Sequence, residues 1–355
     1  MKLLSVTLSM LVLPALSAAQ TPLSGGIWHG AIGALPISVC RNDAESPLLY
    51  YYHSQGKVLR LEADKEGFAL AGGERWRKLR AQGDTISGEW HSGKGKQLAL
   101  QLKAAAHGKH EADERNCAHP VFYQAMQKKV QYREEPPQQF GALAYRNYSL
   151  RLALEGFNAQ LLDQRIELLA PGDGPKRINQ ALRKEFKLAN GMPALLECHA
   201  TALAAHGQDG DYTQEMKPVF ARGPYLSIET SYSNFCGGAH PASGAMVDVW
   251  DLRSGQMLDV WRWFQGGKAE RLPPKLERLL QEKLARAQKE HPDCAAEVAQ
   301  NRSFRVWLSA NGISFSTQLP YVSHACDDTA ELSADSLRPF LNARGKQEMQ
   351  ALFGK

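Results

Sequence analysis

The residues most suited to chemistry form a glycine-rich stretch around one histidine, with the sequence Gly-Gly-Ala-His-Pro at residues 237–241. An imidazole is the side chain that most readily gives or takes a proton near neutral pH. Gly237 and Gly238 allow positive φ and close backbone approach, and Pro241 stiffens the exit. The motif therefore predicts either an exposed loop that presents His240 to a ligand or partner, or a tight bend that locks the fold.

The familiar catalytic signatures do not occur in the sequence. G-x-S-x-G, H-E-x-x-H and G-x-x-x-x-G-K-[ST] are absent, and no C-x2-C spacing suggests zinc. We therefore expect no catalytic residue, no metal ligand and no cofactor. The alternative is a hydrolase whose site assembles from distant residues, for instance around His240 and Asp327.

The sequence has six cysteines, and the first of them is Cys40. An even cysteine count in an exported chain indicates disulfides. Fifteen pairings of six cysteines are possible. Sequence order and the domain division given below favour three pairs, which are Cys40–Cys117, Cys198–Cys236 and Cys294–Cys326.

The first 19 residues have the three parts of a secretory signal peptide. Lys2 supplies a positive charge, an apolar run extends from Leu3 to Leu16, and Ser17 and Ala19 are the small residues before the cut. The run is too short to span a bilayer. We expect cleavage after Ala19 and a periplasmic or secreted protein without a transmembrane segment.

Short segments separated by turn residues fill residues 26–103, which is typical of a small β-barrel or sandwich. Trp28, Trp76 and Trp90 are its candidate core residues. Besides the first strand near residue 26, the expected strands are 35–40, 48–53, 57–62, 67–71, 74–80, 85–90 and 97–103.

From about residue 139 the pattern mixes strands and helices. Helices are predicted after Pro175, Pro193 and Pro273, and a last one can be capped by Ser333 or Ser336. Strands are predicted at 148–154, 166–169, 225–232 and 245–252, and a hairpin joins 304–308 to 313–317 through Asn311-Gly312. The sum is an α+β fold in which an antiparallel sheet has helices packed on one face.

The expected domain organisation is a signal peptide at 1–19, a β domain at 20–120, a linker at 121–138 and an α+β domain at 139–355. Formal net charge is +5, and cations are interspersed with acidic residues. Nucleic-acid binding would need a clustered basic face, so the charge pattern argues against it.

The stretch from Tyr232 to Pro241 resembles the extracytoplasmic domain shared by a lysozyme-sensing anti-sigma factor and a peptidoglycan deacetylase. That family has a strand, Gly-Gly-Ala-His-Pro, and a strand ending in an Asp-Leu-x-Ser/Thr-Gly turn, here residues 251–255. Its closing features match Phe304, Asn311-Gly312, Tyr321 and the helix from Ser333. The resemblance covers roughly residues 140–345.

The resemblance implies a non-catalytic envelope protein that binds a lysozyme-like cell-wall hydrolase or peptidoglycan. Its candidate binding residues are Tyr232, Gly237, Gly238, His240, Pro241 and Tyr321. The β domain is not a sigma-binding segment and the deacetylase catalytic domain is absent, so neither relative's whole role carries over. A periplasmic immunity protein against an exported toxin is an alternative that differs in its partner.

Overall fold

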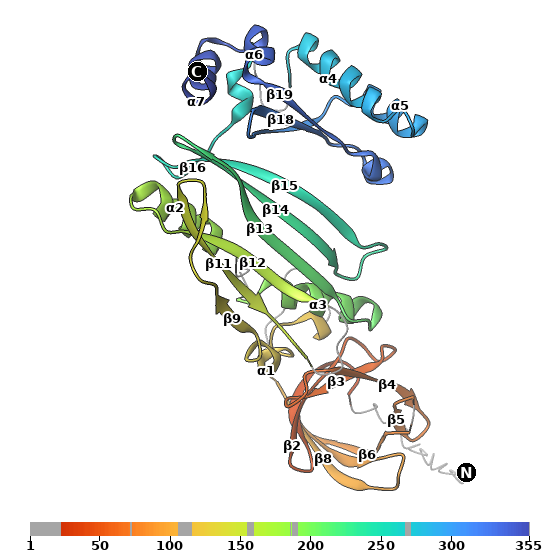
Figure 1. Ribbon diagram of the computed structural model, residues 1–355. Helices are drawn as coiled ribbons and strands as arrows, with labels where there is room; N and C mark the ends of the chain where they lie inside the picture. Colours follow the sequence, from red (N-terminus) through yellow and green to blue (C-terminus); the bar gives the residue numbers. More distant parts are fainter. Residues whose placement is uncertain are drawn as a thin grey trace, which may run out of the picture. The chain divides into compact units, whose positions relative to one another are not determined.

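The computed structural model describes residues 23–71, 73–105, 116–154, 160–184, 186, 191–266 and 271–354. The predicted signal peptide and its cleavage site lie outside these ranges. The chain forms two compact units (Figure 1), one running to Ser54 and over Val58–Asn116, the other holding Gln55–Lys57 and Cys117–Lys355. Within the described ranges, no helix is both long and apolar enough to cross a membrane.

The first unit is a closed antiparallel barrel, in which each strand pairs with the next and β1 pairs with β8. Closure matters because it leaves no unpaired strand edge. The strands are β1 (Gly26–Ile32), β2 (Leu35–Arg41), β3 (Leu48–Tyr52), β4 (Val58–Asp64), β5 (Gly67–Ala69), β6 (Arg75–Gln82), β7 (Thr85–His91) and β8 (Gln97–Ala104).

Aromatic and aliphatic side chains fill the barrel. Trp28, Trp76 and Trp90 are buried as predicted. Glu74 accepts hydrogen bonds from two polar groups of this core, the Tyr50 hydroxyl (2.7 Å) and the Trp90 indole (3.3 Å). The barrel interior is thus a packed core.

The second unit is built on an eight-stranded sheet in the order β10-β11-β12-β13-β14-β15-β16, with β9 paired to β11. The predicted antiparallel sheet is in fact mixed, because β12 and β13 pair in parallel. Its strands are β9 (Gln131–Glu134), β10 (Gln138–Phe140), β11 (Leu143–Arg151), β12 (Leu161–Leu168), β13 (Asp211–Arg222), β14 (Tyr225–Phe235), β15 (Ala242–Asp251) and β16 (Gln256–Met257).

Helices α2 (Asp173–Lys184) and α3 (Ala194–His206) connect β12 to β13. A parallel pair needs such a crossover because the chain must return to the same end of the sheet. Ile178 and Leu182 of α2 pack with Ile166, Leu226 and Trp250 of the sheet. Helix α2 therefore covers the face of the sheet on which Leu226 and Trp250 lie.

The C-terminal part of this unit is a separate three-stranded sheet with helices around it (Figure 1). It shares a core with the large sheet, in which Tyr225 and Val249 meet Trp263 and Phe315. Its elements are η2 (Val260–Trp263), α4 (Pro274–Ala287), α5 (Pro292–Gln300), β17 (Phe304–Leu308), β18 (Gly312–Thr317), η3 (Tyr321–Cys326), β19 (Thr329–Ser333), α6 (Ala334–Leu337), η4 (Arg338–Phe340) and α7 (Ala343–Phe353).

Residues 116–140, which include the predicted linker, are folded. They form η1 (Asn116–Ala118), α1 (Gln124–Gln127), β9 and β10. Phe122, Tyr123 and Met126 are fully buried. From Cys117 onwards, this segment therefore belongs to the second unit.

Candidate binding surface

The Gly-Gly-Ala-His-Pro stretch forms the loop between β14 and β15, at residues 236–241. Gly238, His240 and Pro241 are exposed, whereas Cys236 and Gly237 are partly buried. The first residues of the loop therefore face the protein and the later ones face solvent.

Helix α3 holds the buried start of this loop. A disulfide joins Cys198 to Cys236, and the ring of His206 donates from Nε2 to the Gly237 carbonyl at 2.8 Å. Gly237 has φ of +86°, and a Cβ at this position would lie 2.8 Å from the Cα of Ala202. Both the left-handed conformation and the close approach require glycine here.

Gly238 is under no such constraint. Its φ lies outside the left-handed region, and the nearest atom to an added Cβ is the His240 carbonyl oxygen at 3.8 Å. Of the two predicted glycines, only Gly237 must be a glycine for the backbone to adopt its observed conformation. The motif is thus a tight bend at its first residue and an exposed tip beyond it.

Tyr232 lies on β14 directly opposite Gly244 of β15. A Cβ added at Gly244 would come within 2.9 Å of the Tyr232 hydroxyl, so the phenol ring lies across the neighbouring strand. Tyr232 is partly buried in this position. It packs on the sheet at the end where the loop begins.

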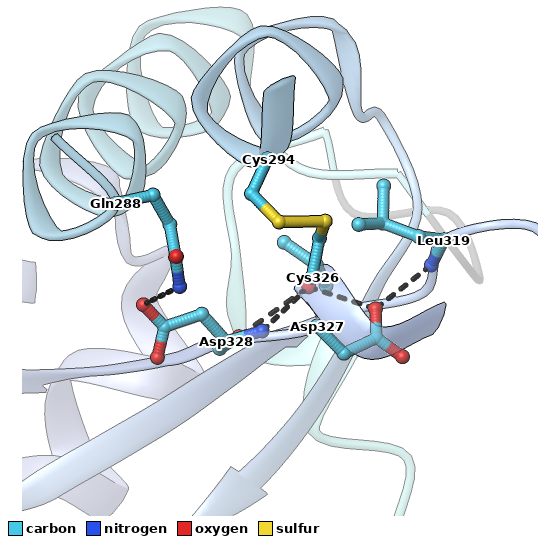
Figure 2. The surroundings of a disulfide bond; sticks show 7 residues. Gln288, Cys294, Leu319, Cys326, Asp327 and Asp328 are labelled. Atoms are coloured by element: carbon cyan, nitrogen blue, oxygen red, sulfur yellow. Dashed lines mark hydrogen bonds between the residues drawn. A yellow bond between two sulfur atoms is a disulfide. The ribbon is translucent and has the colours of Figure 1, made fainter. Parts of the chain in front are cut away.

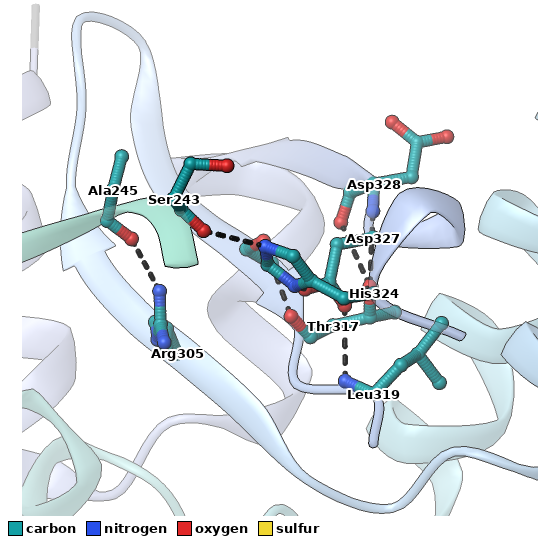
Figure 3. A network of polar contacts seen from close by, with 9 residues as sticks. Ser243, Ala245, Arg305, Thr317, Leu319, His324, Asp327 and Asp328 are labelled. Atoms are coloured by element: carbon teal, nitrogen blue, oxygen red, sulfur yellow. Dashed lines mark hydrogen bonds and ion pairs between the residues drawn. The ribbon is translucent and has the colours of Figure 1, made fainter. Parts of the chain in front are cut away.

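The outer edge of β15 is capped by side chains from the C-terminal part. Strand β16 pairs only with Trp250 and Asp251, at the far end of β15. Nearer the loop, His324 of η3 donates from Nε2 to the Ser243 carbonyl at 3.0 Å, and Arg305 of β17 donates to the Ala245 carbonyl (Figure 3). These contacts satisfy two carbonyl groups on the edge of β15.

The carboxylate of Asp327 fixes the other end of η3. It accepts hydrogen bonds from the Thr317 hydroxyl (2.9 Å), the Leu319 amide (3.0 Å) and Nδ1 of His324 (2.7 Å), as Figure 3 shows. His324 thus contacts two acceptors, a carboxylate and a carbonyl.

A disulfide between Cys294 and Cys326 ties η3 to helix α5 (Figure 2). Next to it, Gln288 donates to the Asp328 carboxylate at 3.1 Å. Cys40 and Cys117 are also disulfide-bonded, and the described residues include no free cysteine. The Cys198–Cys236 and Cys294–Cys326 bonds have the partners that sequence order favoured.

With these anchors, the tip of η3 is exposed next to the exit of the loop. Val322 has 91% of its surface accessible, which is unusual for an apolar side chain. Tyr321 begins η3, and its side chain lies outside the described part of the structure. The predicted loop, Tyr232 and η3 therefore meet around Ser243 and Gly244.

The two residues considered from the sequence as an acid–base pair have different surroundings. Asp327 contacts His324, three residues earlier, whereas His240 is exposed on its loop. Sequence reasoning missed His324 and Arg305. The His-x-x-Asp spacing at 324–327 was the available signal for the first, and nothing local marked the second.

One further histidine lies beneath the loop, on the helix that anchors it. His199 of α3 is 1% exposed and accepts a hydrogen bond from the Gly210 amide at Nδ1 (3.2 Å). Desolvation lowers the pKa of His199 from 6.5 to about 4. This ring is therefore neutral at neutral pH.

The sequence matches no protein-family model and no curated protein. A solved structure of a DUF3298 family member from Bacteroides fragilis is 16% identical, with a TM-score of 0.41, covering 60% of this chain and 100% of that one. A DUF3298 family protein from Pseudomonas aeruginosa is 14% identical, with a TM-score of 0.36, covering 60% and 92%. Both neighbours are described as DUF3298 family proteins.

Proposed function

We propose that this protein is a non-catalytic binding protein of the cell envelope. Its binding surface is the loop at 236–241 together with η3. The observation that carries this proposal is the combination of firm anchoring and exposed tips. Each segment is held by one disulfide and one histidine-to-carbonyl hydrogen bond, while Gly238, His240 and Val322 face solvent.

Rigid exposed segments suit recognition because little conformational entropy is lost when a partner binds. Loops positioned by a firm scaffold carry binding residues more often than other segments do. An exposed apolar side chain such as Val322 can add buried contact area. Asp327 accepts hydrogen bonds from three donors, which are the Thr317 hydroxyl, the Leu319 amide and Nδ1 of His324, and these contacts suit an anchoring role.

The disulfides support an extracytoplasmic location, because cytosolic thiols are normally kept reduced. The partner class comes from the motif resemblance, which implies peptidoglycan or a lysozyme-like hydrolase. Either partner would be met in the periplasm or outside the cell.

The test is to measure binding of the mature protein to purified peptidoglycan and to lysozyme, alongside assays for glycan cleavage, deacetylation and ester hydrolysis. Binding without turnover is expected, and His240→Ala should weaken it by about tenfold, equivalent to about 1.4 kcal/mol. Turnover that His240→Ala abolishes would contradict the proposal. So would the failure of both partners to bind.

A further inference from the structure

A second candidate site lies at the other end of the second unit, where helix α7 ends. Two cavities of about 290 and 250 Å³ lie next to each other and share Ala334, Asp335 and Phe353 in their walls. We call this feature the C-terminal groove. It is separate from the loop at 236–241 and from η3, which contribute no residue to either wall.

Three cations line the C-terminal groove, which are Arg222 of β13, Arg338 of η4 and Lys346 of α7. None of them forms an ion pair with a carboxylate in the part of the chain that the structure describes. Arg338 and Lys346 are exposed. The groove therefore presents cations that form no ion pair among the described residues, together with the carboxylate of Asp335.

Arg222 also has a structural role. It donates to the Leu352 carbonyl at 3.3 Å, and its guanidinium lies 5.0 Å from the centre of the Phe353 ring. These contacts hold the last turn of α7 in place. Arg338 and Lys346 have no comparable contact among the described residues, so they are the cations free to meet a ligand.

The remaining wall is acidic at one point and rich in amides. Asp335 borders both cavities, and Gln347 and Gln350 contribute side-chain amides, whereas the Asn311 amide donates to the Glu331 carboxylate at 2.7 Å. Buried Met349 supplies part of an apolar floor. Amides can pair with peptide groups, and Asp335 can accept from an N–H group or an amine.

We propose that the C-terminal groove binds a short acidic peptide. Its carboxylates meet Arg338 and Lys346, its amide groups meet the glutamines, and its N–H groups meet Asp335. A polyphosphate or nucleic acid fits less well, because Asp335 would repel it and three cations are few for a polyanion. This site is additional to the proposed envelope-binding surface.

The test is calorimetric titration of the mature full chain with the peptide acetyl-Glu-Ala-Glu-amide, its Gln-Ala-Gln analogue and inorganic phosphate, each up to 10 mM. We expect saturable binding of the glutamate peptide alone. The double variant Arg338→Gln/Lys346→Gln should weaken binding at least tenfold, because it removes both charge-assisted contacts. Arg344→Gln is the matched control, since Arg344 is exposed on the same helix and does not line the groove.

Three results would overturn the proposal. They are no saturation by the glutamate peptide, equal binding of the glutamine analogue, and equal or tighter binding of phosphate. Unchanged affinity in the double variant would also overturn it. All variants are exposed substitutions, and an unchanged melting temperature confirms that each remains folded.

Discussion

The loop at 236–241 and the η3 segment are both anchored to the protein while exposing their tips, but different contacts anchor them. Each is fixed by a disulfide to a helix, α3 or α5, and by a histidine that donates to a main-chain carbonyl. At the loop, the remaining constraint is backbone packing of Gly237 on Ala202. At η3, it is the polar network around Asp327.

This difference determines which substitutions each segment tolerates. Backbone packing leaves no room for even one methyl group at Gly237, yet it requires no particular charge. A polar network tolerates small steric changes, yet it fails when one acceptor is lost. The four predictions below separate these two modes of anchoring.

The largest effect is expected from removing either disulfide. The bonds close segments with sequence separations of 38 and 32, so the chain-entropy relation gives about 4 kcal/mol for each. Cys198→Ala/Cys236→Ala and Cys294→Ala/Cys326→Ala should therefore lower the free energy of unfolding by similar amounts in urea titrations. A loss confined to one pair would show that the two anchors are not equivalent.

The next effect distinguishes the two glycines. Gly237→Ala should cost about 3 kcal/mol, because the new Cβ meets the backbone of α3 and φ is left-handed. Gly238→Ala is the matched control and should cost less than about 1 kcal/mol. Thermal unfolding of both variants measures the difference, and equal melting temperatures would exclude the close packing of Gly237 on α3.

Acid should weaken the α3 anchor through His199. Its pKa is about 4 when folded against 6.5 as the unperturbed value, so the unfolded chain takes up the proton first. The stability contribution is complete above about pH 6.5 and falls as the pH drops towards 4, by about 2 kcal/mol at pH 5. Urea titrations between pH 7 and 4 measure this slope.

His199→Asn provides the comparison for the pH series. The Asn side chain can accept from the Gly210 amide at the position of Nδ1 but does not titrate. The variant should therefore show a shallower loss of stability between pH 6.5 and 4. An identical slope in both proteins would assign the acid sensitivity to other groups.

The smallest effect concerns the η3 network. Asp327→Asn should cost about 2 kcal/mol, because the amide accepts fewer hydrogen bonds and places N–H groups near existing donors. Hydrogen exchange should rise in η3 while the loop at 236–241 stays protected. Glu282→Gln serves as the control for an exposed carboxylate, and equal exchange in the two variants would argue against the anchoring role of Asp327.

Much of the first unit could be predicted from the sequence, because turn residues recur about every ten positions and mark each strand end. The expected strand at 85–90 is observed as Thr85–His91, and 97–103 as Gln97–Ala104. Short antiparallel strands are local features that a single sequence carries well. The sequence pattern does not distinguish a closed barrel from two stacked sheets.

The second unit was less predictable because its decisive contacts join distant residues. Asn311-Gly312 does mark a hairpin, but Gly312 is required for another reason. A Cβ there would lie 2.0 Å from the Leu332 carbonyl oxygen on β19, and φ is not left-handed. The contacts of His324 with Ser243 and of Arg305 with Ala245 join residues that are 81 and 60 positions apart in the sequence. No local sequence pattern predicts such contacts.

The central claim is that the loop and η3 form one binding surface, and paired affinity measurements test it most directly. Dissociation constants for peptidoglycan and for lysozyme should be compared among wild type, His240→Ala, Val322→Asp and Leu35→Asp. Leu35 is the control because it is an exposed apolar residue, at 50%, on the barrel. We predict that the first two variants weaken binding to the same partner by about tenfold or more, equivalent to about 1.4 kcal/mol, while Leu35→Asp leaves it unchanged. Binding that survives both His240→Ala and Val322→Asp, or that is lost in Leu35→Asp, would contradict the account.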